Sequence, residues 1–94
     1  MPRFIIERNV PGASTLTAQE LRDIAAKSNA VVAALGEPYT WITSYVAGDK
    51  IYCIHGASSA ETIRRHARKG GFPADCVTEI AAVIGPATAQ GKAS

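Results

Sequence analysis

The sequence is poor in features that mark several specialised classes of small protein. Its two cysteines, Cys53 and Cys76, are too few for a disulfide framework and favour reduced thiols in a cytoplasmic protein. The longest apolar run, Ala30–Leu35, is far below the roughly 18 residues that a membrane helix needs. The first residues contain no cleavage signal, so we expect neither secretion nor membrane insertion.

Charge is also sparse. Ten Lys and Arg residues against eight Asp and Glu residues give a formal net charge of +2. Electrostatics therefore provide no reason to expect a nucleic-acid partner. The hydrophobic share of 47% excludes a disordered chain, and 94 residues are enough for one domain only.

Periodicity and turn residues predict the order strand, helix, strand, strand, helix, strand. The strands are expected over residues 3–10, 39–46, 51–55 and 77–84. This is the order of the ferredoxin-like fold, an α+β domain (βαββαβ) whose helices cover one face of a four-stranded antiparallel sheet. We assign residues 1–85 to this domain and expect residues 86–94 to form a tail that is flexible or contacts a partner subunit.

Both helices carry N-terminal capping signals. Thr17 and Glu20 form a predicted capping box before the first helix, which is expected to end at Gly36. Ser58 and Glu61 have the same spacing before the second helix.

Side-chain alternation along the strands predicts which residues lie on the sheet face that the helices leave open. In the first and last strands of the chain, the apolar set is expected under the helices: Phe4, Ile6, Ile80 and Ile84. In the hairpin, a two-residue or four-residue turn would place Tyr45 and Tyr52 on one face. We favour a three-residue turn, which puts another set under the helices: Ile42, Val46, Tyr52 and Ile54. The open face then carries Glu7, Trp41, Thr43, Tyr45, Cys53, His55 and Glu79.

A monomer with this open face would leave Trp41 and Tyr45 in water. We therefore expect a homodimer in which two sheets meet face to face, a dimeric α/β-barrel-like assembly that encloses a partly polar cavity. The alternative is a monomer with a half-exposed sheet.

Several segments resemble a family of small bacterial ferredoxin-like domains of formerly unknown function, which includes an actinobacterial nickel-binding protein. The segments are Met1–Arg8, Trp41–Val46, Asp49–Ile54, His66–Pro73 and Glu79–Thr88. The resemblance implies the fold, a homodimer and a nickel cofactor. Thr43 and Gly85 depart from the family pattern at positions that often carry potential metal ligands.

The candidate metal ligands are Glu7, His55 and Glu79, with His66 as a secondary candidate. Imidazole nitrogen and carboxylate oxygen are donors that divalent nickel accepts. Alternatively, the two glutamates pair with Arg3 or Arg8, and His55 lines an interface.

A second hypothesis is a cofactor-free enzyme, or a small-molecule-binding protein, that uses the same dimer cavity. Trp41, Tyr45 and Tyr52 are the candidates for contacts with a bound molecule. No nucleophile with its base and no phosphate-binding loop is visible in the sequence, so we name no catalytic residue.

Overall fold

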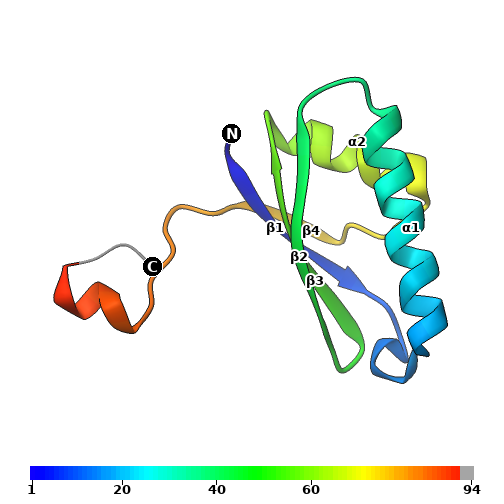
Figure 1. The fold of residues 1–94 in the computed structure, drawn as a ribbon, viewed down its shortest axis with the longest axis horizontal. Helices are drawn as coiled ribbons and strands as arrows, with labels where there is room; N and C mark the ends of the chain where they lie inside the picture. The colour runs from blue at the N-terminus through cyan, green and yellow to red at the C-terminus, as the bar shows by residue number, and fades with distance from the viewer. Residues whose placement is uncertain (92–94) are drawn as a thin grey trace.

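The computed structural model describes residues 1–91, and Figure 1 shows their arrangement. A four-stranded antiparallel sheet has the order β2-β3-β1-β4. Two α-helices, α1 and α2, lie on one side of it (Figure 1). The strands are β1 (Arg3–Asn9), β2 (Tyr39–Ala47), β3 (Lys50–Ala57) and β4 (Cys76–Glu79). The predicted ferredoxin-like α+β fold is confirmed.

Both helices begin close to the capping residues that the sequence predicts. Helix α1 spans Ala18–Ala34, and the Thr17–Glu20 capping box is confirmed. The Thr17 hydroxyl accepts a hydrogen bond from the backbone amide of Glu20, and the Glu20 carboxylate accepts one from the backbone amide of Thr17. Helix α2 spans Ala60–Gly70 and is capped by Ser59. The prediction of Ser58 as the cap was wrong by one residue, because adjacent serines offer the same hydroxyl acceptor.

The hairpin turn differs from the favoured prediction. Ala47 pairs with Lys50, so only Gly48 and Asp49 form the turn. Gly48 has a φ of 59°, the left-handed conformation that two-residue hairpin turns favour. The three-residue turn was therefore wrong, and Tyr45 and Tyr52 are paired on one face, as the two-residue alternative requires.

A β-bulge in β2 adds a second change of face. Trp41 pairs with His55 and Thr43 pairs with Ile54, so Ile42 is the extra residue. The bulge places Trp41 on the helix-covered face with His55, which pairs with the buried Phe4 of β1. Tyr52 and Ile54, which were expected under the helices, lie on the open face instead.

The last strand is shorter than predicted. β4 ends at Glu79, which pairs with Phe4, and β1 itself begins at Arg3, so the chain beyond Ile80 has no strand to pair with. Ile84, expected under the helices, is 79% exposed on an arm that leaves the domain (Figure 1). The arm continues into a short 3-10 helix, η2 (Pro86–Gln90).

The buried core lies between the sheet and the two helices. Phe4 and Ile6 from β1 pack with Ile51 from β3 and Ile63 from α2. A short 3-10 helix, η1 (Ala13–Thr15), adds Ala13 to this core. None of the helices in residues 1–91 is long and apolar enough to cross a membrane.

Candidate functional site

Three aromatic side chains from different elements meet beneath the helices. Tyr39 of β2, His55 of β3 and His66 of α2 form a cluster in which the two histidine rings lie 5.2 Å apart, edge to face. Tyr39 stacks on His66 at 4.9 Å, and its hydroxyl is hydrogen-bonded to His55 Nδ1. The fold thus joins two histidines that are eleven residues apart in the sequence.

Burial keeps both imidazoles neutral at pH 7. His55 and His66 are 1% and 0% exposed. Burial, with smaller contributions from His66 and the Arg8 charge, lowers the pKa of His55 to about 3. Burial and the Arg8 charge also lower the pKa of His66. Burial likewise raises the pKa of Tyr39, so the cluster carries no charge of its own.

The His66 ring is only partly satisfied by its surroundings. Its Nε2 atom is 3.1 Å from the hydroxyl oxygen of Ser28 on α1, within hydrogen-bond distance. Its Nδ1 atom is buried and has no hydrogen-bond partner among the described residues. A neutral imidazole tolerates this arrangement better than a charged one, because both ring nitrogens of the imidazolium are donors.

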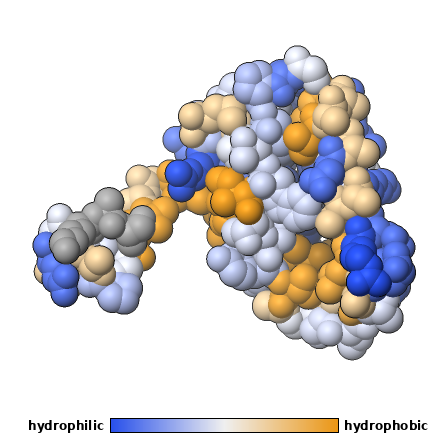
Figure 2. All heavy atoms as spheres, in the orientation of Figure 1, coloured by the Kyte–Doolittle hydropathy of each residue, from blue (hydrophilic) through white to orange (hydrophobic). Residues whose placement is uncertain are grey.

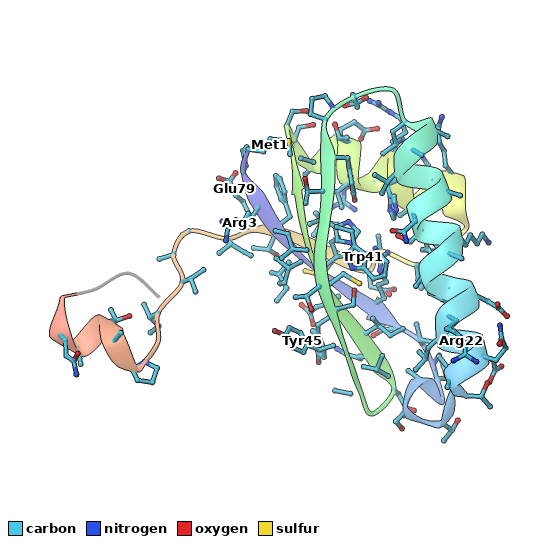
Figure 3. All side chains as sticks on the ribbon, viewed as in Figure 1. Met1, Arg3, Arg22, Trp41, Tyr45 and Glu79 are labelled. Carbon is cyan, nitrogen blue, oxygen red and sulfur yellow. The ribbon has the colours of Figure 1, made fainter. Side chains whose placement is uncertain are left out.

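A pocket opens beside this cluster, between α1 and the covered face of the sheet. Its volume is about 370 Å³, and His55 contributes to its wall. Figure 3 shows Trp41 on this side of the sheet, directed towards α1, whereas Tyr45 lies on the other side.

A continuous series of hydrogen bonds connects the polar groups of the pocket. Trp41 Nε1 donates to the Ser44 hydroxyl at 2.9 Å, and this hydroxyl donates to Cys53 Sγ at 3.0 Å. Arg8 Nε donates to the same sulfur at 3.3 Å. Arg8 Nη1 donates to the carbonyl oxygen of Pro73 in the loop after α2. Cys53 is a buried free thiol, as expected for its position in a strand.

The open face has a different chemistry. Glu7, Tyr52 and Tyr45 lie side by side across β1, β3 and β2. Glu7 and Lys50 form an ion pair of 3.5 Å near the solvent. The Tyr45 side chain is 62% exposed.

The predicted ligand set is divided between the two faces. Glu7 is on the open face, as expected, together with Thr43 and Tyr45. His55 and Cys53 lie on the covered face, where they pair with Phe4 and Ile6, and the bulge in β2 places Trp41 on the same face. Glu79 is also off the predicted face, because it pairs with Phe4 whereas Glu7 pairs with Cys76.

These placements limit what one chain can hold. Among residues 1–91, no group of three or more His, Cys, Asp or Glu side chains lies close enough to bind one ion. Glu7, His55, Glu79 and His66 do not converge within a single copy, although His55 and His66 do meet. Residues 1–91 of one copy therefore do not by themselves provide three such ligands for a nickel ion.

Sequence reasoning missed Arg8 as a residue of the covered face. Arg8 follows Phe4 and Ile6 at the alternating spacing of a strand, and the side chain is 5% exposed. The signal was present in the sequence: a charged residue in an otherwise apolar set marks a buried polar site.

The sheet order and the two helices on one face define a ferredoxin-like α+β domain. A family model described as nickel responsive protein SCO4226-like matches residues 4–80, so the chain belongs to this family. The resemblance drawn from the sequence is therefore confirmed at the level of the family.

A solved structure supports the same fold. The chain is similar to SCO4226 from Streptomyces coelicolor A3(2), known from a crystal structure, with 24% sequence identity and a TM-score of 0.72. The match covers 87% of this chain and 99% of that chain. Among curated proteins, none matches this chain.

Proposed function

We propose that this chain is a nickel-binding protein that acts as a homodimer, in which the open sheet faces of two copies meet and share the ion. One observation carries this proposal: the open face combines a carboxylate, Glu7, with the exposed side chain of Tyr45. Ile42, in the bulge of β2, is also 46% exposed. Aromatic and apolar groups gathered on one sheet face favour burial against a partner. Membership of a nickel-responsive family supports the identity of the metal.

The C-terminal arm gives independent support for a second copy. It leaves the domain on the side of the sheet opposite the helices (Figure 1), and apolar residues are visible along it in Figure 2. Val83 and Ile84 are the exposed apolar residues of this arm. We propose that the arm packs against the partner, which is the second of the two alternatives, flexible or partner-contacting, predicted for the tail over residues 86–94. Residues 92–94 lie outside the described part of the chain.

The charge distribution favours the open face over the histidine pair as the place for a cation. The Arg8 charge acts on both His55 and His66 and opposes their protonation. The same repulsion opposes a divalent ion bound to these rings. Among residues 1–91, Glu7 forms an ion pair with Lys50, whose side chain is 43% exposed, so this positive charge lies near the solvent. We therefore assign the shared site to Glu7 of both copies.

Calorimetric titration of the full chain with nickel chloride tests this assignment. We expect saturable binding that Glu7→Gln weakens at least tenfold, while Glu61→Gln, a matched change on exposed α2, leaves it unaltered. Weakening by His55→Ala or His66→Ala, with Glu7→Gln silent, would move the site to the covered face. Absence of saturable binding would refute the nickel proposal.

Sedimentation equilibrium tests the assembly. We expect a dimer for the full chain and a monomer for Tyr45→Asp, which places a charge in the proposed contact. Ala33→Asp, an equivalent change on the exposed surface of α1, should leave the dimer intact. A full chain that stays monomeric at high concentration would refute the shared site.

A further inference from the structure

The pocket between α1 and the sheet goes beyond the proposed nickel site, because it lies on the other face. Its walls are largely apolar: Leu21, Ile24, Trp41, Val46 and Phe72 contribute to them. A volume of about 370 Å³ is within the range of small-molecule sites. Figure 2 shows hydrophobic residues gathered where the sheet and α1 approach each other.

Arg8 is a buried charge that has no countercharge among residues 1–91. The side chain is 5% exposed and lines the pocket. Its hydrogen-bond acceptors are the sulfur of Cys53 and the carbonyl oxygen of Pro73, and its guanidinium lies 5.6 Å from the centre of the Phe72 ring. No carboxylate of residues 1–91 lies within ion-pair distance of it. A guanidinium stays charged in proteins, and burying it unpaired is costly.

The rest of the pocket provides no compensating charge. Its lining residues in the described part of the chain include no Asp or Glu. His55 reaches the wall and is neutral, since its pKa lies far below 7. The pocket therefore has one fixed positive charge, that of Arg8, within an apolar wall. This combination is complementary to an organic anion.

We propose that this pocket binds a small organic anion, with its charged headgroup at Arg8 and its apolar body between the sheet and α1. The guanidinium offers several N–H donors, of which Nε and one Nη1 hydrogen are used within the protein. An anionic group paired with it in this apolar setting gains a charge-assisted hydrogen bond. The His55 ring lies on the same pocket wall and can orient the ligand.

A matched pair of fluorescent probes tests the requirement for charge. Anilinonaphthalene sulfonate and N-phenylnaphthylamine share an aromatic body, but only the first carries a negative group. We expect the full chain to bind the sulfonate about tenfold to a hundredfold more tightly, the range given by one hydrogen bond to a charged group. Trp41, the single tryptophan, lines the pocket and should transfer excitation energy to the bound probe.

Substitution of Arg8 tests its role. Arg8→Met should remove the preference for the sulfonate, and Arg8→Lys should keep part of it. Arg64→Gln, which removes a charge from exposed α2, should have no effect. Octanoate should displace the sulfonate from the full chain, and uncharged octanol should displace it less.

The result that would overturn the proposal is equal affinity for the two probes in the full chain, or unchanged sulfonate binding in Arg8→Met. Binding without energy transfer from Trp41 would also overturn it, because the probe would then lie elsewhere. Circular dichroism tests whether the Arg8→Met variant is folded. If it is not, the full chain with both probes and the Arg8→Lys variant still decide the question.

Discussion

The buried histidines make stability depend on pH above the range in which carboxylates titrate. His55 has an ordinary pKa of 6.5 and a pKa of about 3 in the folded chain. Below pH 6.5 the unfolded chain therefore binds a proton at His55 that the folded chain does not. Acidification thus favours unfolding, and the stabilisation is fully present only above pH 6.5.

The size of this effect follows from the two pKa values. Between pH 7 and pH 5, the difference in protonation lowers the free energy of unfolding by about 2 kcal/mol for His55 alone. His66, whose pKa is also lowered, adds a loss of the same sign. A small domain is stable by only about 5–15 kcal/mol, so this loss is large enough to measure.

Urea denaturation followed by circular dichroism at pH 7, 6 and 5 measures the loss directly. The variant His55→Gln should be less stable at pH 7 but should lose about 2 kcal/mol less than the full chain on acidification. A free energy of unfolding that does not change between pH 7 and pH 5 would refute the reasoning. So would a variant with the same pH dependence as the original chain.

Three further changes have defined consequences for urea denaturation. Thr17→Ala removes the hydroxyl that accepts from the Glu20 amide and should cost about 1 kcal/mol, and no measurable loss would argue against the cap. Ile63→Ala leaves a cavity at a fully buried position and should cost about 2–5 kcal/mol, whereas a loss below about 1 kcal/mol would contradict its place in the core. Gly70→Ala would bring its Cβ within 2.3 Å of the Phe72 ring and should cost about 1–3 kcal/mol while altering the near-ultraviolet spectrum, so an unchanged spectrum would contradict this contact.

Local signals in the sequence were sufficient for the order of the elements. The capping residues Thr17 and Glu20 begin α1 as predicted, because a cap is formed by atoms three residues apart. The Gly48-Asp49 pair marked the hairpin, since a glycine adopts positive φ without strain. The length of β4 was not predictable in this way, because a strand ends where its neighbour ends, here at the start of β1.

The candidate site depended on register, which local signals do not determine. One residue more or less in the turn, or one bulge at Ile42, exchanges the two faces of β2, and in this chain both differ from the favoured prediction. The two-residue turn separates His55 from Tyr45, and His55 pairs with Phe4 on the covered face, while Glu7 pairs with Tyr52 on the open one. The bulge then returns Trp41 to the face of His55.

The sequence by itself determined the ferredoxin-like order of elements, the family and the placement of Glu7. Only the tertiary structure decided that His55 meets His66 and that Arg8 is enclosed with no carboxylate of the described residues 1–91 in ion-pair distance. The physical reason is that helix caps and turns act over a few residues. The neighbours of the buried charge on β1, by contrast, come from β3 and the loop after α2 and depend on how these segments pack.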